Sequence, residues 1–285
     1  MPEEEDEEVQ EDQEAPEVQK LIPEGFYDPD GGGAVQVRLR QMPQQDFCLL
    51  RSIGYKDPEY ASPFLVPAPD TNFRTDLTSV PTVFLWLVPT VGTHLPAALL
   101  HDALVYDEDE PKTYQGPDTT PEEADRIFRD AMRGLGVARI RRWLIWTGVT
   151  IFTAFTRLEP HRRWQAVVVF TLGIVVVLGI VATLDLLDIW DVLPWMGERS
   201  TGAELIGGAI FAVLIPALLS ILWGRLWRAG LIAGVALALL LHITIAVAIV
   251  LVVYMAAEWV ISRPEQMGPG VRTNLGVPVD DRECF

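Results

Sequence analysis

Cysteine is scarce in this chain, which has two cysteines among 285 residues. Cys48 and Cys284 lie far apart and lack the short spacings with which cysteines bind zinc. A disulfide framework and a cysteine-based metal centre are therefore excluded as the expected basis of the fold. Cys48 stands in the apolar segment FCLL, which predicts an ordinary core residue.

Positive charge is also scarce, because 22 Lys and Arg face 39 Asp and Glu, a net charge of −17. Most of the acidic excess lies in residues 1–33. This segment has too little apolar surface to offset the entropy lost on folding, so we predict a disordered acidic tail over 1–33. Its charge repels phosphate backbones, so no nucleic acid is expected as a partner.

No apolar run follows the N-terminus, so the sequence predicts neither a signal peptide nor a transit peptide. Long apolar runs begin only after Trp164. Three of them, at about 166–187, 205–223 and 231–253, have the roughly 20 residues that a bilayer requires. We therefore predict a membrane domain over 164–262 with three transmembrane helices.

Charges around these runs predict the orientation. Arginines precede the first span and lie between the second and third, whereas the loop between the first and second spans is acidic. The positive-inside rule then places the N-terminal unit in the cytoplasm and residues 263–285 outside as an extracytoplasmic tail. The expected location is the bacterial cytoplasmic membrane, with the lipid bilayer as a partner. A GxxxG motif from Gly230 to Gly234 permits close helix packing, which makes a homo-oligomer a further candidate.

Between the tail and the first span, the pattern predicts a small cytosolic α+β domain over 34–160. Alternating or short apolar runs predict strands at residues 35–39, 47–53 and 64–66. Helices are expected at residues 78–88, from Pro96 onward, at 121–134 and at 138–155. The third of these is the clearest, because Thr120 and Glu123 have the spacing of a capping box around Pro121. The expected fold class is thus an α+β domain followed by an α-helical three-span membrane domain.

One stretch, from Thr75 to Tyr106, gathers the side chains that could carry chemistry. As a hydrolytic site, His101 would activate water or Ser79, and an aspartate, Asp76 or Asp125, would orient the imidazole.

Two other interpretations of the same stretch stay open. As a metal site, His101 and Asp102 with Asp76 or Asp107 would hold a divalent cation, although adjacent helical residues point about 100° apart. As a structural network, Asp76 would cap the 78–88 helix, and His101 and Asp102 would join their helix to the strands by buried hydrogen bonds. No cofactor is expected.

His242 stands in the middle of the third expected span. An ionisable residue at this depth is by default a functional candidate, here for a proton or ion pathway. The alternative is a hydrogen bond between two membrane helices.

Three motifs carry a resemblance to a known family. They are FLVPAPDTNFRTDLTSVP, then AALLHDALVY, then EEADRIFRDAMRGLGV with RRW after it. In this order they resemble DUF1353, a family found in phages and prophages, over residues 34–146. Thr78 replaces the usual alanine, and HDALVY is one residue longer than the family's motif, so no role is carried over to Tyr106. The family has no assigned reaction.

An acidic tail and three spans added to such a domain resemble the architecture of membrane proteins from Streptomyces-type bacteria that attach contractile injection systems to the cytoplasmic membrane. This resemblance implies a membrane-anchored adaptor that recruits a phage-tail-like particle through sheath or baseplate proteins and aids its firing and cell death. The alternatives are a membrane-tethered hydrolase with a His-Asp site and a holin-like pore.

Overall fold

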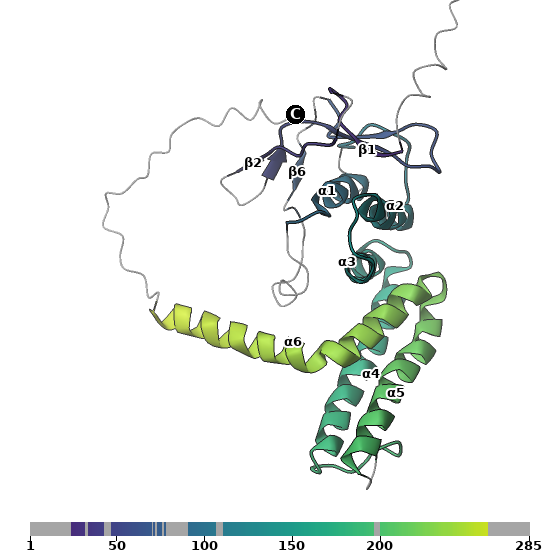
Figure 1. The fold of residues 1–285 in the computed structure, drawn as a ribbon, viewed down its shortest axis with the longest axis vertical. Helices are drawn as coiled ribbons and strands as arrows, with labels where there is room; N and C mark the ends of the chain where they lie inside the picture. Colours follow the sequence, from purple (N-terminus) through teal and green to yellow (C-terminus); the bar gives the residue numbers. More distant parts are fainter. Residues whose placement is uncertain are drawn as a thin grey trace, which may run out of the picture.

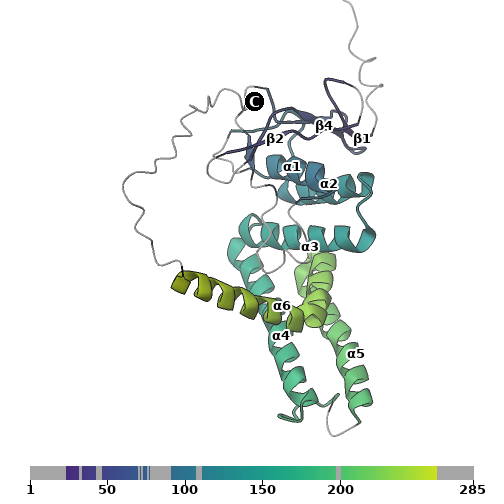
Figure 2. The same ribbon diagram turned by 60° about the vertical axis from the view of Figure 1, so that its left-hand side comes forward.

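The computed structural model describes residues 24–31, 34–42, 47–69, 71, 73–75, 77, 91–106, 111–196 and 200–261. These residues are arranged in successive layers along the long axis of the molecule (Figures 1 and 2). Two small sheets lie at one end, three helices follow beneath them, and a group of long apolar helices extends from the other side.

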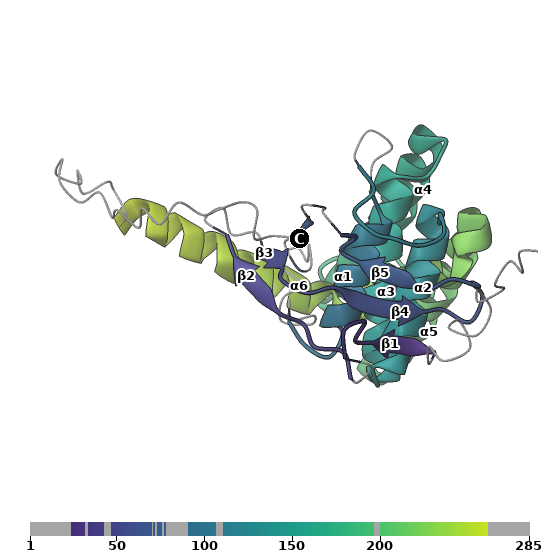
Figure 3. The same cartoon turned by 90° about the horizontal axis from the view of Figure 1, so that it is seen from above.

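Both sheets are three-stranded and antiparallel (Figure 3). The first has the order β1-β4-β5, with β1 at Gly25–Tyr27, β4 at Ile53–Lys56 and β5 at Phe64–Val66. The second has the order β2-β3-β6, with β2 at Leu39–Gln41, β3 at Phe47–Leu49 and β6 at Arg74–Thr75.

The strand predictions are correct only in part. The strand at 64–66 is confirmed as β5, but the run 47–53 divides into β3 and β4, which belong to different sheets. The strand predicted at 35–39 is wrong for residues 35–38, which are not part of a strand, because β2 begins at Leu39.

Strand β1 lies inside the segment expected to be a disordered tail, so ordered structure begins earlier than predicted. Its pairing with β4 explains the difference, since the ring of Tyr27 covers Gly54, where any Cβ would collide with it. Phe26 adds a ring contact to Tyr55 at 4.8 Å between centroids. These contacts come from residues distant in sequence, which a local pattern does not reveal.

Three helices form the layer beneath the sheets: α1 at Leu95–Leu104, α2 at Pro121–Gly134 and α3 at Arg139–Thr156. All three were expected from the sequence, and the capping box of α2 is present in full. Gly136, with φ of 73°, follows the end of α2 in the left-handed conformation that suits glycine. The helix expected at 78–88 lies outside the described residues.

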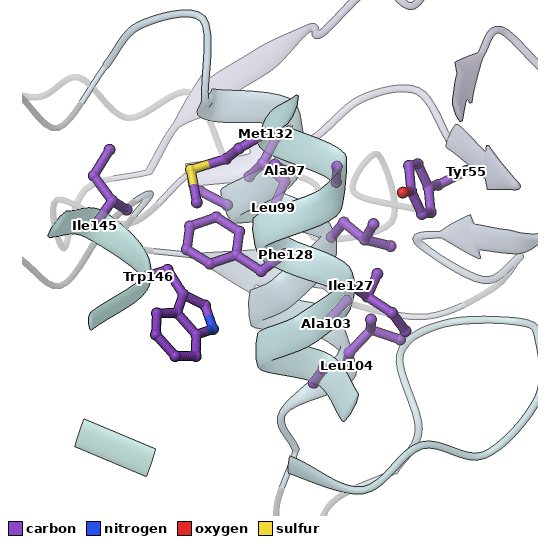
Figure 4. Packing of buried hydrophobic residues seen from close by; sticks show 14 of the residues in the cluster. Tyr55, Ala97, Leu99, Ala103, Leu104, Ile127, Phe128, Met132, Ile145 and Trp146 are labelled. Atoms are coloured by element: carbon purple, nitrogen blue, oxygen red, sulfur yellow. The ribbon is translucent and has the colours of Figure 1, made fainter. Parts of the chain in front are cut away.

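The core between these helices is apolar and continuous (Figure 4). Phe128 and Met132 of α2 face Ile145 and Trp146 of α3, and Leu99 of α1 lies beside them. All five side chains are at least nine-tenths buried. Burial of this apolar surface is the main favourable contribution to the stability of the domain.

The apolar region contains α4 at His161–Leu186, α5 at Thr201–Leu219, the 3₁₀ segment η3 at Ser220–Leu226 and α6 at Trp227–Ile261. Within the described residues, two helical stretches are long and apolar enough to cross a membrane, His161–Leu186 and Thr201–Ile261. The second includes α5, η3 and α6, and it is kinked within η3 at Gly224, where φ is 51° and ψ is −117°. The sequence predicted three separate spans. The structure has two candidate stretches, because the second and third predicted spans both fall within Thr201–Ile261.

Helix α6 has two differently packed parts. Its first part lies against α4 and α5, and its buried residues all fall between Ala229 and Leu241. Residues 243–261, which we call the α6 arm, lead away from α4 and α5 (Figures 1 and 2). No residue of the arm is buried.

Helix α3 joins the α+β domain to the apolar helices. It packs on α2 from one side and on α4 and α6 from the other. As a result, Trp164 and Trp223 of the apolar region share one hydrophobic core with Leu99 and Phe128 of the domain. The segment 157–160 between α3 and α4 is short, so no flexible linker separates the two regions.

Cys48 departs from the prediction of an ordinary core residue. It is completely buried, as expected, but it is disulfide-bonded.

Candidate functional site

His101 and Asp125 form a direct contact between α1 and α2. The buried face of α1 is made by Leu100, Ala103 and Leu104, and His101 lies at the margin of this face. Its Nε2 lies 2.8 Å from Oδ1 of Asp125. Because a carboxylate only accepts hydrogen bonds, Nε2 carries the proton in this contact.

Asp125 is held in place from a third helix. Its side chain is 3% exposed, and the hydroxyl of Thr153 on α3 donates to the same Oδ1 at 3.1 Å. The other oxygen, Oδ2, is buried without a hydrogen-bond partner in the described part of the chain. Two more buried hydroxyls on α3, those of Thr147 and Thr150, also have no hydrogen-bond partner among the described residues. Buried polar atoms of this kind normally bind water.

The imidazole of His101 is positioned but still accessible. Its side chain is 15% exposed, and its ring packs on Phe128 with 5.0 Å between centroids. Chemically, this pair resembles the base and orienting residue of a hydrolytic site, in which an aspartate fixes the tautomer of a histidine. The hydroxyl of Thr153 contacts the aspartate and not the ring. Among the described residues no serine, threonine or cysteine is hydrogen-bonded to His101 as a nucleophile would be.

The structure divides the residues that the sequence grouped. It brings His101 and Asp125 together and leaves Asp102 on the exposed side of α1. Asp76, Ser79 and Asp107 lie outside the described residues. The prediction that His101 joins α1 to the strands is wrong, because its partner belongs to α2.

The arrangement does not reproduce the expected metal site in the region that the structure describes. No group of three or more His, Cys, Asp or Glu side chains there could hold a metal ion. The turn of α1 explains this for the adjacent pair, since the ring of His101 faces α2 while Asp102 faces outward. Tyr106 packs elsewhere, edge-on against Tyr114 at 5.9 Å.

A second polar cluster, which sequence reasoning missed, joins α2 to the sheet. Asp57 at the end of β4 is completely buried and accepts two hydrogen bonds of 3.3 Å from Arg126, which also lies 3.4 Å from Glu59. Burial lowers the pKa of Arg126, but the hydrogen bonds and charge of Asp57 outweigh it and the pKa is raised. Burial, with the charge of Asp57, raises the pKa of nearby Tyr55. The partners are 69 residues apart, and although Arg126 stands in the third motif, nothing in that motif points to Asp57.

His242 hydrogen-bonds within the apolar region. Its Nε2 lies 2.6 Å from the hydroxyl of Thr183 on α4, which in turn donates to the carbonyl of Gly179. A second polar contact, from Trp223 Nε1 to Thr171 Oγ1 at 3.1 Å, joins η3 to α4. The geometry at His242 is that of an interhelical hydrogen bond.

Comparison with known proteins identifies one similarity. Residues 47–149 match the model of a family described as a protein of unknown function, DUF1353. The matched segment begins at β3 and ends within α3, so it includes His101 and Asp125 but neither Thr153 nor the apolar helices. No curated protein and no solved structure matches the chain.

Proposed function

We propose that this protein is a membrane-anchored adaptor that holds a phage-tail-like contractile injection particle at the bacterial cytoplasmic membrane. The α+β domain would bind sheath or baseplate proteins, and the apolar helices would hold the complex in the bilayer and aid firing and cell death. The resemblance of its three motifs to phage and prophage sequences supports this choice of partner.

The observation that carries the proposal is the shared core of the domain and the apolar helices. Phe128 and Trp223 belong to one hydrophobic cluster, and α3 lies between the two regions. Arg225 of η3 also pairs with Glu122 at the start of α2. An anchor that resists a contracting particle requires such a rigid connection, whereas a tethered enzyme does not.

We propose three spans, α4, α5 and α6, with the α+β domain in the cytoplasm and residues 263–285 outside. Support comes from the arginines, because Arg162, Arg163, Arg225 and Arg228 gather at the end of the bundle that adjoins α3. The disulfide at Cys48 argues the other way, since such bonds persist mainly in oxidising compartments. Reporter fusions at the N-terminus and after residue 261 distinguish the two orientations.

The adaptor function is tested by isolating the tagged chain from membranes and identifying what accompanies it. Sheath or baseplate proteins should co-purify with the full chain and be absent when residues 34–160 are deleted. In cells that lack the chain, the particles should leave the membrane fraction and appear in the soluble fraction. Particles that stay with the membrane in such cells would refute the proposal.

A membrane-tethered hydrolase is the second candidate, and the contact between His101 and Asp125 favours it. The variant His101→Gln distinguishes the two functions, because its amide can still donate to Asp125 but cannot act as a base near neutral pH. A hydrolase would lose its cellular function in this variant while keeping its stability. An adaptor would keep both.

A further inference from the structure

A groove opens between α4 and α5 where the α6 arm departs. Its volume is about 330 Å³, and most of its lining is apolar. Small residues form much of the lining: Gly179 and Ala182 on α4, and Gly208, Ala209 and Ala212 on α5. Small residues of this kind are typical of surfaces on which one membrane helix packs against another.

The last packed turn of α6 closes one end of this groove. Ala238, Leu239 and His242 line it, and the arm begins at the next residue. The groove therefore lies on the path that α6 would follow if it continued straight along α4 and α5. The hydrogen bond from His242 to Thr183 fixes α6 to α4 at the point of departure.

Within the part of the chain that the structure describes, no element covers the α6 arm, which does not suit its apolar sequence. It carries no charged residue before Glu258, and its large apolar side chains, such as Ile249 and Val253, are 58% and 62% exposed. A helix that is apolar on all sides is stable only when it is surrounded by protein or lipid. The segment 235–261 contains neither proline nor glycine, the residues that most often cause kinks, so its sequence favours a straight helix.

The contacts of the packed part of α6 set the register of a straight continuation. A Cβ added at Gly234 would lie 2.7 Å from Pro216 of the antiparallel α5, and one added at Gly179 of α4 would lie 2.6 Å from Leu241. Continued in the same register, α6 places Ile245 opposite Leu205 of α5 and beside Thr183 of α4. Ile249 follows one turn further along the groove.

We propose that the groove is the docking site of the α6 arm, and that α6 has two positions, an undocked one as described and a docked one in which the arm lies between α4 and α5. His242 and Thr183 form the pivot between them. A second copy of the chain is a poorer occupant, because the arm lies across the direction of α4 and α5 (Figures 1 and 2). Copies aligned in one bilayer could not receive such an arm lengthwise.

The docked position changes the number of transmembrane spans in the proposed membrane domain. With the arm undocked, α4 and α5 form a helical hairpin and the arm lies beside it. With the arm docked, α6 completes a third span and carries residue 261 to the opposite side of the bilayer. The inference rests on the proposed membrane insertion but not on any injection particle.

Disulfide cross-linking tests the docked position. The double variant Leu205→Cys with Ile245→Cys is oxidised in native membrane vesicles, and the cross-linked peptide is identified by mass spectrometry in the monomer band of a non-reducing gel. The matched control is Ile206→Cys with Ile245→Cys, since Ile206 is 64% exposed and does not line the groove. We expect the 205–245 cross-link to exceed the control at least fivefold.

Two results would overturn the inference: equal yields from both pairs, or a 205–245 cross-link found only in the dimer band. Extraction of the same vesicles with alkaline carbonate separates this failure from that of the proposed function. A chain removed by carbonate is not membrane-inserted, which refutes both. A chain that resists extraction but gives no specific cross-link refutes only the docking of the arm.

Discussion

At the scale of single residues, the contact between His101 and Asp125 has two consequences that can be measured separately. It satisfies a carboxylate that is almost completely buried, and it leaves one ring nitrogen of His101 free of that contact. The first consequence concerns stability and the second concerns chemistry. Variants of His101 separate them, because alanine removes both properties and glutamine removes only the second.

We expect His101→Ala to destabilise the protein by about 1–3 kcal/mol, the usual cost of removing a hydrogen bond from a buried charged group, because Asp125 would keep only the hydrogen bond from Thr153. Thermal unfolding in detergent, followed by tryptophan fluorescence, measures the loss. His101→Gln serves as the control and should recover most of it. If both variants unfold at the wild-type temperature, the contact has no structural role.

Glu123 provides a prediction about pH. The backbone N–H of Thr120 donates to its carboxylate at 2.9 Å, and this hydrogen bond lowers the pKa of Glu123 below its ordinary value. Since the folded pKa is the lower one, the stabilisation is present above the ordinary pKa of glutamate and is lost as the pH falls through the folded value. The difference in melting temperature between the wild type and Glu123→Gln should therefore be larger at pH 7 than at pH 3. A difference that does not change with pH would contradict the assignment.

The sequence identified the members of this contact better than it identified their pairing. His101 stood out as half of a His-Asp pair in an apolar helical pattern, and Asp125 was one of two aspartates considered as its orienting partner. Choosing between Asp125 and Asp76 required knowing that α2 packs on α1, which is a tertiary fact. Asp57 and Arg126 lie 69 residues apart, and no spacing or motif links the two, so a single sequence gave no reason to pair them.

At the scale of secondary-structure elements, an ion pair determines how α2 sits on the sheet, and a close steric contact determines how α6 sits on η3. The first depends on the ion pair of Asp57 with Arg126. The second depends on Gly230, where an added Cβ would lie 2.6 Å from the ring of Trp223. Each can be tested with a closely matched control.

We expect Arg126→Met to destabilise the α+β domain by about 3–5 kcal/mol, because it leaves the buried carboxylate of Asp57 without its cation. Arg133→Met is the control, since Arg133 is exposed near the end of the same helix and should change the stability by no more than about 0.5 kcal/mol. Thermal unfolding of both variants decides the matter. Equal losses would show that the pair at Asp57 is energetically unimportant.

Two Gly→Ala substitutions should act in opposite directions. In a helix interior, alanine is intrinsically favoured over glycine by about 1 kcal/mol. Gly173→Ala should therefore keep or raise the melting temperature in detergent, because nothing lies within 4 Å of the added Cβ. Gly230→Ala should lower it, because the methyl group displaces Trp223 and strains its hydrogen bond to Thr171.

The elements themselves were predicted to very different degrees. Helix α2 was located well, since a capping box, a proline at the first helical position and an apolar face all agree there. The strands were located poorly because each is only two to four residues long and depends on its neighbours for pairing. The third span was expected from apolar length alone, and length does not determine whether α6 follows α5 or turns away.

At the scale of the whole molecule, the α+β domain and the apolar helices depend on each other. Helix α3 is covered by α2 on one side and by α4 and α6 on the other. Residues such as Ile145, Trp146 and Ala154 belong to the core that both regions share. Removing the apolar helices therefore uncovers one side of α3.

We expect a chain that ends at residue 157 to bind hydrophobic dyes and to aggregate, because the side of α3 that α4 and α6 cover becomes exposed. Replacing surface-facing apolar residues of α3 in this truncated chain, for example Ile140→Lys, should not rescue it, since Ile140 is already 77% exposed in the full chain. Light scattering of the purified fragment measures the outcome. A monomeric, dye-free fragment would show that the domain is complete without the membrane region.

The short segment 157–160 between α3 and α4 has a mechanical meaning. A long linker would let the sheet end of the molecule tilt and rotate over the bilayer, so a pull on it would only extend slack chain. Here a pull would reach α4 directly and act on it as a bending moment. In the proposed membrane-anchored arrangement, the bilayer would then respond to the direction of the force on the α+β domain as well as to its size.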